Sequence, residues 1–267
     1  MTHCADSSPT TVSSPDYSST TPDRWVLKGG AGLLTRLADA ARHSQDLDLF
    51  YQGQQAAAVD DIMTAAHLEL GDWFDFEIGT PKPIGGVHKG QQLPVTALLD
   101  GKEFSRFTVD TVVAVNITQP PEPAPPLSPV SIPELPTTTY ILYSLVDHIA
   151  DKHAAMLQEF GGKASSRYRD LVDLVLIAES QPISASPLQT ALLSEYAHRG
   201  LTPPKQVSLP TEEWVAGYAA EVKNAPAAKA RTAHDALQLV SAFLNPILTS
   251  KSSGNWDPNT ATWTDGD

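Results

Sequence analysis

The sequence predicts an α+β protein, with a mixed sheet and flanking helices in its N-terminal half and a bundle of helices in its C-terminal half. Before residue 119, short apolar runs alternate with segments of helical periodicity, whereas after residue 136 only helical periodicity is found. Between them lies QPPEPAPPLSPVSIPELP, whose eight prolines exclude a helix or a central strand. We therefore expect an α/β domain at 23–118, a linker at 119–136 and a helical domain at 137–250.

The N-terminal half combines strand and helix patterns. Strands are expected where apolar and β-branched residues form short runs, and helices where apolar residues recur every three or four positions. Pro83 and the pair Gly85-Gly86 indicate a turn region from residue 82 to 92. The expected order is strand 24–27, helix 31–43, strand 46–51, helix 56–70, and strands 73–79, 95–100 and 106–117.

The C-terminal half is predicted to be helical throughout. Gly161-Gly162 and Gly200 are typical of helix ends, and Thr211 before two glutamates is typical of an N-cap. The polar tail at 251–267 is expected to be loosely held, and the Ser/Thr/Pro-rich segment 1–22 to be flexible. The expected helices span residues 140–160, 165–180, 186–200, 209–224 and 228–248.

Charge and cysteine content restrict the possible functions. The 267 residues include 31 acidic and 18 basic ones, a net charge of −13, which argues against a general nucleic-acid coat. A nucleic-acid substrate would need a local basic patch and a reason for acids to face it, such as a divalent cation. The single cysteine, Cys4, excludes a disulfide framework and a cysteine-based zinc site. We see no signal peptide and no membrane span, and expect a cytoplasmic protein.

The stretch RHSQDLDLFY, residues 42–51, places Asp46 and Asp48 two positions apart in an apolar strand. Side chains at this spacing point to the same face, where two carboxylates repel each other and burial raises their pKa. A divalent cation removes both penalties, and Mg²⁺ prefers carboxylate oxygens, water and phosphates. The pattern is weak by itself, because most such pairs are surface acids.

Two further features sharpen this interpretation. Gly29-Gly30 stands between a short strand and a helix, where backbone N–H groups can approach a phosphate. Asp110 is an isolated acid in an apolar strand and needs a partner. If its strand lies beside that of Asp46 and Asp48, the three carboxylates could hold two metal ions, as in-line nucleotidyl transfer requires.

These residues resemble the signature of the polymerase-β nucleotidyltransferase superfamily, a Gly-Gly or Gly-Ser turn followed by D-x-D on a strand. The longer gap between Gly30 and Asp46 is similar to that of AbiEii-type toxins from abortive-infection (type IV-like) toxin–antitoxin pairs, including the mycobacterial MenT toxins. Four blocks match in order: KGGAGL at 28–33, RHSQDLD at 42–48, ADKHAAM at 150–156 and RYRDLVDL at 167–174.

The resemblance implies a nucleotidyltransferase-like N-terminal domain and roles at named positions. Asp46 and Asp48 would bind Mg²⁺ (or Mn²⁺), and Asp110 would be the third carboxylate and a possible base. Lys152 and Asp170 would act from the helical domain. The residues expected to bind NTP and its phosphates are Lys28, Gly29, Gly30, Arg42, Ser44, Lys152 and Asp173.

Several charged residues also have an ordinary structural interpretation. Lys28 and Arg42 could be surface charges or carboxylate partners. Salt bridges from two nearby arginines to Asp170 and Asp173 are the default for such a run. The helix histidines have no partner at metal-ligand spacing and are taken as packing or surface residues. The arginines are Arg167 and Arg169, and the histidines are His148, His153 and His234.

Three functions follow from these expectations. The leading one is an Mg²⁺-dependent nucleotidyltransferase toxin that transfers nucleotides from NTP to an RNA, with the 3′ end of tRNA as the expected acceptor, and so blocks translation. The densest basic cluster, Lys152, Lys163, Arg167 and Arg169, would line the RNA side. The second function has a protein or small-molecule hydroxyl as acceptor, which the charge of −13 favours. The third is a non-catalytic antitoxin-binding module.

Regulation is implied in two ways. The resemblance implies a cognate antitoxin as partner. Ser44, between the glycines and the acids, is a position where phosphorylation would add about two negative charges beside three carboxylates. We expect such a phosphate to block NTP and metal binding.

Overall fold

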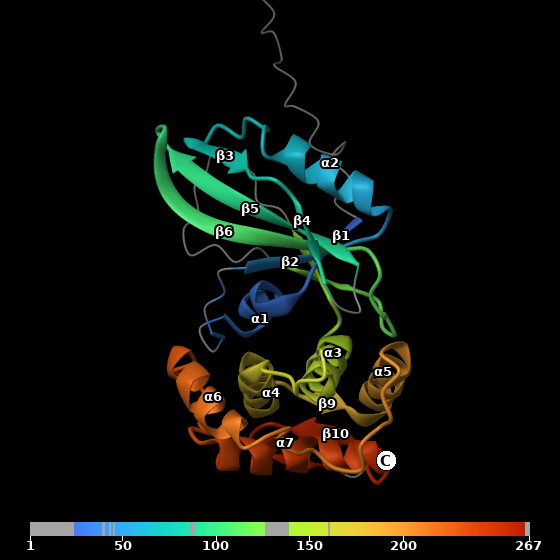
Figure 1. Ribbon diagram of the computed structural model, residues 1–267. Coiled ribbons are helices and arrows are strands. Elements are labelled where there is room, and N and C mark those ends of the chain that lie inside the picture. Colours follow the sequence, from blue (N-terminus) through green and yellow to red (C-terminus); the bar gives the residue numbers. More distant parts are fainter. Residues whose placement is uncertain are drawn as a thin grey trace, which may run out of the picture.

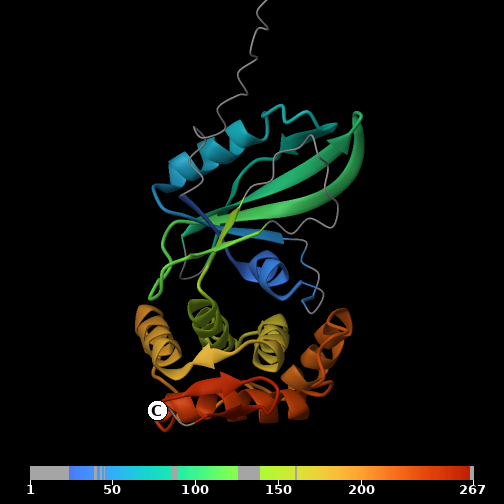
Figure 2. The same ribbon diagram turned by 180° about the vertical axis from the view of Figure 1, so that it is seen from behind.

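The computed structural model describes residues 24–38, 41–42, 44, 46–85, 89–125, 139–159 and 161–264. In this part of the chain, a twisted sheet with two helices lies above a layer of helices (Figure 1). The expected α+β class is therefore confirmed. The view from behind shows helix α1 (Gly29–Leu37) between the sheet and the helical layer (Figure 2).

The sheet has β3 and β7 at its two edges and is mixed in direction. Its strands follow the order β3-β5-β6-β2-β1-β8-β7, and β4 pairs with β5 off this path. Helix α2 (Gln55–Ala65) covers one face, where Val59 and Ile62 pack against Leu93, Val95 and Val109. The strands are β1 (Trp25–Leu27), β2 (Asp46–Tyr51), β3 (Phe74–Ile78), β4 (Lys82–Ile84), β5 (Gly90–Leu99), β6 (Lys102–Val112), β7 (Glu122–Ala124) and β8 (Tyr140–Leu142).

The pairing of β2 with β6 positions the acids. The two strands are parallel neighbours, and Asp48 lies directly opposite Asp110 while Asp46 lies opposite Thr108. Because side chains alternate along a strand, the residues between the acids face the other way. Leu47 is packed on the face that α2 covers. The expected adjacency of these two strands is thus confirmed, and the acids share the face that points toward the helical layer.

Five α-helices form the second layer in the described part of the chain. Their shared core also includes Leu33 and Leu37, which lie four residues apart on one face of α1. Helix α1 follows β1 and precedes β2 in the chain, but these two leucines pack in the core of the helical layer. It therefore fixes the two layers against each other. The elements are α3 (Leu145–Leu157), α4 (Tyr168–Ser180), α5 (Ala185–His198), α6 (Glu213–Glu221), the 3₁₀ turn η4 (Val222–Asn224) and α7 (Ala233–Leu248).

Two expected elements are wrong near the centre of the chain. Residues 140–142 are strand β8, not the first turn of a helix, because Leu142 pairs with Leu27 of β1 and the segment completes the sheet. The expected turn at 82–92 is shorter than predicted. Strand β4 occupies its start and β5 begins at Gly90, so the apolar partners across the sheet outweigh the local turn signals.

Two helix starts also differ from the prediction. Helix α6 begins at Glu213, and Thr211 does not cap it with its side chain. Helix α7 begins at Ala233 rather than near 228, because the Thr232 hydroxyl accepts a hydrogen bond from the Asp235 backbone N–H at 3.1 Å. Such a cap satisfies an N–H that would otherwise have no partner in the helix.

The C-terminal tail is held, contrary to the expectation of a loose segment. Strands β10 (Asn255–Asp257) and β11 (Thr262–Trp263) form a small sheet with β9 (Ile183–Ser184). Trp256 is buried, and its indole N–H donates to the carbonyl of Ala178 at 2.7 Å. The tryptophans, rather than the polar residues around them, decide how this segment packs, because they bury a large apolar area.

The predicted segment boundaries stay predictions. Of the proline-rich segment 119–136, residues 122–124 form β7 at the edge of the sheet, where proline is tolerated, and residues 126–136 lie outside the described part. The segment 1–22 also lies outside it. Among the described helices, none is long and apolar enough to cross a membrane.

Candidate active site

The glycine turn lies directly against Asp48. Gly29 has φ +55°, and a Cβ at this position would lie 1.7 Å from Asp48 Oδ2. A Cβ on Gly30 would lie 2.6 Å from the Ser44 hydroxyl. The Lys28 backbone N–H also donates to the Asp48 carbonyl at 2.8 Å. Only glycine allows this approach, so the turn before α1 and the strand β2 form one unit.

Three carboxylates lie on the neighbouring strands β2 and β6. Asp46 is exposed and accepts a hydrogen bond from the Thr108 hydroxyl at 2.6 Å. Asp110 accepts one from the Gln92 amide at 3.0 Å. Partial burial, with the Asp110 carboxylate as second cause, raises the pKa of Asp48 above its ordinary value. Burial also raises the pKa of Asp110, although the Gln92 hydrogen bond acts against it.

The donor set fits a divalent cation in its chemistry. In this conformation, no group of three or more His, Cys, Asp or Glu residues in the described part of the chain is close enough to hold a metal ion. Asp46 and Asp110 instead turn to Thr108 and Gln92. Yet the three carboxylates share one sheet face, and the raised pKa of Asp48 marks a charge that a cation would stabilise.

The opposite wall of the cleft is a buried ionic network. The Lys152 ammonium lies 2.6 Å from Asp173 Oδ2 and 3.1 Å from Asp170 Oδ1. Arg42 binds the Asp173 carboxylate with two contacts, at 2.9 and 3.1 Å. Arg167 reaches Asp170 at 2.5 Å. Arg42 comes from the segment before β2 and Asp173 from α4, so this pair joins the two layers.

The network keeps its members charged. Burial lowers the pKa of Lys152, but Asp173 and Asp170 outweigh it, so the net direction is upward. Burial likewise acts to raise the pKa of Asp170, and Lys152 and Arg167 lower it below its ordinary value. Each buried charge therefore has an opposite charge beside it. This arrangement supplies positive charge from α3 and α4 to the cleft between the layers.

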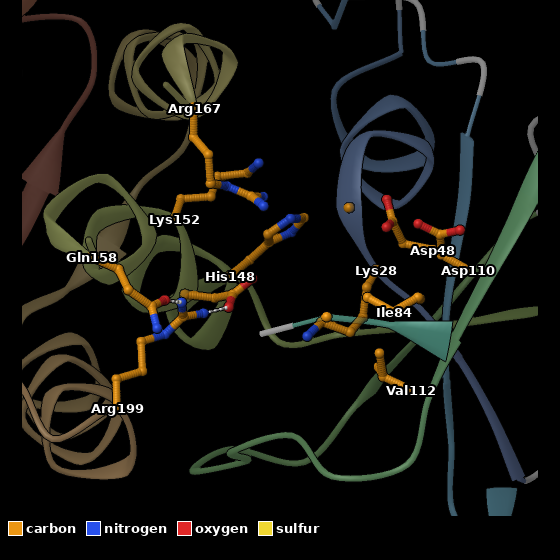
Figure 3. A pocket seen from close by; sticks show the side chains of 13 residues that line it. Lys28, Asp48, Ile84, Asp110, Val112, His148, Lys152, Gln158, Arg167 and Arg199 are labelled. Atoms are coloured by element: carbon orange, nitrogen blue, oxygen red, sulfur yellow. Dashed lines mark hydrogen bonds and ion pairs between the residues drawn. The ribbon is translucent and has the colours of Figure 1, made fainter. Parts of the chain in front are cut away.

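Two connected chambers make up the cleft. The first has a volume of about 190 Å³ and the second of about 390 Å³. Both are lined by Gly29, Asp48, Asp110, Lys152 and Arg167, so the two chambers meet at the carboxylates. Figure 3 shows these acids on the sheet side and the cationic side chains of the helical layer on the other side.

The structure places the predicted residues in different surroundings. Gly30, Ser44, Asp46, Arg42 and Asp170 line the second chamber, beside the glycine turn. Lys28 lines the first, with its ammonium 4.4 Å from the centre of the Tyr143 ring. Asp173 is buried and serves as counterion to Arg42 and Lys152. Arg167 forms the expected salt bridge with Asp170, whereas Arg169 forms one with Glu221 rather than with Asp173.

Several cleft residues were not found from the sequence. His148 was interpreted as a packing or surface residue, but it lines the first chamber. It precedes Lys152 by four residues, which places both on one face of α3, and this spacing was the available signal. One of the others, Val112, follows Asp110 by two residues and so shares its face of β6, whereas the rest are brought to the cleft by elements distant in the sequence. The residues missed besides His148 are Ile84, Val112, Gln158 and Arg199.

A sheet that carries three acids behind a glycine turn, opposite a cationic helical wall, defines a nucleotidyltransferase-type site. The family model "Nucleotidyl transferase AbiEii toxin, Type IV TA system" matches residues 17–249. The chain therefore belongs to the AbiEii nucleotidyl transferase toxin family. Such membership implies an antitoxin partner and an NTP substrate. Nucleotidyl transferases of this kind generally use divalent metal ions.

Two of the solved structures that are similar to this chain come from Helicobacter pylori. The crystal structure of JHP933 from Helicobacter pylori is 14% identical and has a TM-score of 0.46, with 87% of this chain and 88% of that chain covered. A second H. pylori protein of known crystal structure is 16% identical with a TM-score of 0.44, and the coverage is 86% and 91%. No curated protein sequence matches this chain.

Proposed function

We propose that this protein is an Mg²⁺-dependent nucleotidyltransferase toxin that adds nucleotides from NTP to the 3′ end of tRNA and thereby blocks translation. The contact between Gly29 and the Asp48 carboxylate carries this proposal. It brings the backbone N–H groups at the start of α1 next to the acids of β2. Phosphates bind well at such a helix N-terminus, and metal-binding acids beside it suit a metal–triphosphate complex.

The donor's phosphates fit the second chamber. Gly29, Gly30 and Ser44 line that chamber at the start of α1 and before β2, and Lys152 and Arg167 provide positive charge from the other side. Asp46, Asp48 and Asp110 would hold Mg²⁺. When bound there, the metal would lower the pKa of the attacking hydroxyl and neutralise the leaving pyrophosphate.

The chemical step needs one proton acceptor. The oxygen of the acceptor hydroxyl forms a bond to the α-phosphorus, the bond from that phosphorus to the bridging oxygen breaks, and pyrophosphate leaves. Asp110 would take the hydroxyl proton, because it borders both chambers and lies where they meet. Gln92 orients it through the 3.0 Å hydrogen bond.

An RNA acceptor is supported by the charges near the second chamber. Arg167 and Arg169 line it, and their side chains are 53% and 58% exposed. Lys163 is exposed in the segment before them. Although the whole chain is acidic, this group supplies the local positive charge that phosphate recognition requires.

The experiment is incubation of the purified protein with Mg²⁺ and each labelled NTP in turn, with total tRNA or with a tRNA-free protein lysate. Label in tRNA supports the proposal, and label only in the lysate shows the second function, a protein or small-molecule acceptor.

Asp46→Ala and Asp48→Asn test the metal-binding residues, and each is expected to lower the transfer rate at least about a thousand-fold, the scale of about 4 kcal/mol. Full activity in either variant contradicts the metal assignment. No NTP binding by calorimetry would favour the non-catalytic antitoxin-binding module.

Ser44 is proposed as the control point. Its hydroxyl lies 3.1 Å from the Asp46 carbonyl and beside Gly30. A phosphate there would occupy the place of the donor's phosphates and add charge next to three carboxylates. We expect Ser44→Glu to lower transfer at least about ten-fold, about 1.4 kcal/mol, and Ser44→Ala to lower it less. Unchanged transfer by Ser44→Glu would argue against this role.

A further inference from the structure

The first chamber of the cleft has a different lining from the second. Ile84 of β4 and Val112 of β6 form an apolar wall on the sheet side, and His148 and Gln158 of α3 and its C-terminal end face them. The two chambers meet at Asp48 and Asp110, so a ligand with its phosphates in the second can extend into the first. Most of the other described residues that line it are charged or polar, so Ile84 and Val112 provide the one apolar surface of this chamber against which a flat organic ring can lie.

Gln158 is held in one orientation by Arg199. The Arg199 guanidinium donates to the Gln158 side-chain oxygen at 2.6 Å, and it also binds Glu195 at 2.5 Å and Asp151. Because a guanidinium can only donate, the amide oxygen of Gln158 must face Arg199. The Gln158 NH₂ group then points elsewhere. No residue in the described part of the chain accepts a hydrogen bond from it.

His148 is a buried imidazole directed into this chamber. Its side chain is among the buried polar groups, and it extends into the space between the layers in Figure 3. None of the described residues forms a hydrogen bond with its ring nitrogens. Burial, followed by Lys152, lowers the pKa of His148 well below its ordinary value, so the ring is neutral. A neutral imidazole has one donor and one acceptor nitrogen, and both can serve a ligand in this chamber.

We propose that the first chamber binds the nucleoside half of the donor NTP, and that Gln158 and His148 select the nucleobase through hydrogen bonds to its edge. This inference rests on the proposed function. Ile84 and Val112 contact the face of the base. The Gln158 NH₂ group donates to a carbonyl oxygen or ring nitrogen of the base, and Arg199 prevents the amide from turning round. The chamber therefore determines which nucleotide is transferred.

The test is calorimetry on the full chain with Mg²⁺, without acceptor, using ATP, CTP, GTP, UTP and inorganic tripolyphosphate. Gln158→Ala is expected to weaken the binding of the preferred NTP roughly ten-fold, the scale of one lost hydrogen bond. It should leave the affinity for tripolyphosphate unchanged. Gln158→Glu keeps the Arg199 contact but replaces the donor by an acceptor, so its preference should shift toward bases with an amino group, in ATP, CTP and GTP, and away from UTP.

Matched controls separate this effect from general disturbance. Gln206→Ala and His234→Ala change the same residue types at exposed positions outside the chamber and should bind all ligands as wild type does. His148→Ala tests the second polar group, and His148→Gln is used if the alanine variant does not fold. Melting temperatures establish that each variant is folded.

The possible outcomes decide the inference. An unchanged ranking of the four NTPs in the Gln158 and His148 variants overturns it, and so does an equal loss of NTP and tripolyphosphate binding. If the wild type binds NTP with this base dependence but transfers none to any acceptor, the inference stands and the proposed function fails. If the wild type binds no NTP, both fail.

Discussion

Asp48 and Asp170 are aspartates of the same cleft whose surroundings move their pKa in opposite directions. Partial burial and Asp110 raise the pKa of Asp48. Burial acts in the same sense on Asp170, but Lys152 and Arg167 reverse it, so the pKa of Asp170 is lowered. The sheet wall therefore has carboxylates that face another carboxylate, whereas the helical wall has carboxylates with cations in direct contact.

Contact with an opposite charge distinguishes acids that serve the fold from acids that are free to bind a ligand. A buried charge whose opposite charge is already in contact contributes to the fold. Two like charges that face each other destabilise the folded state, and such pairs are found at cation-binding and catalytic sites. By this criterion Asp170 and Asp173 hold the helical wall together, and Asp48 and Asp110 are the groups that a metal would stabilise.

The largest effect is expected from breaking the helical network. Asp173 is 1% exposed at its side chain and binds Arg42 and Lys152. Asp173→Asn leaves two buried cations short of a counterion and is expected to lower the free energy of unfolding by about 3–5 kcal/mol. Urea unfolding measures it. Glu221→Gln is the control, because its partner Arg169 is 58% exposed, and it should cost less than about 1 kcal/mol. Equal effects would show that the network does not stabilise the fold.

The next effect concerns the sheet wall and its metal. Mg²⁺ should raise the melting temperature of the wild type, because a ligand that binds only the folded state stabilises it, by about 2.7 kcal/mol at a hundred-fold excess over Kd. Asp48→Asn should abolish this gain. Asp75→Asn, at an exposed position of β3 in the same sheet, should retain it. A gain that persists in Asp48→Asn would place the metal elsewhere.

The sequence was informative where the chemistry is local. The glycine turn and the shared face of the two acids of β2 follow from motif spacing and strand alternation, whereas the pairing with Asp110 could only be stated as a condition until the structure showed it. Strand β8 and the held tail were missed because Leu142 and Trp256 depend on partners distant in the sequence. The orientation of Gln158 could not be predicted for the same reason, since Arg199 lies on another helix.

The smallest expected effect is the pH dependence of the stability that is lost when the Asp48 carboxyl group ionises in the folded state. A carboxyl group whose pKa is raised by folding binds its proton more tightly in the folded state, so ionising it costs stability. Below its ordinary value of 3.8 both states are protonated and the penalty is absent. The cost grows as the pH rises from 3.8 toward the raised pKa and is fully present above that raised pKa. Without metal, Asp48→Asn should therefore be more stable than wild type near pH 7.

Urea unfolding of both proteins between pH 4 and 8, with a chelator present, measures this difference. The contribution of Asp170 runs the other way, because its lowered pKa gives stability that is lost as the pH falls. That contribution is present in both proteins and cancels when they are compared. The advantage of Asp48→Asn should shrink toward pH 4 and should vanish at pH 7 when Mg²⁺ binds the wild type. A constant difference across the range would mean that ionising Asp48 costs no stability. Asp48 and Asp170 would then not differ in the way that their opposite pKa shifts imply.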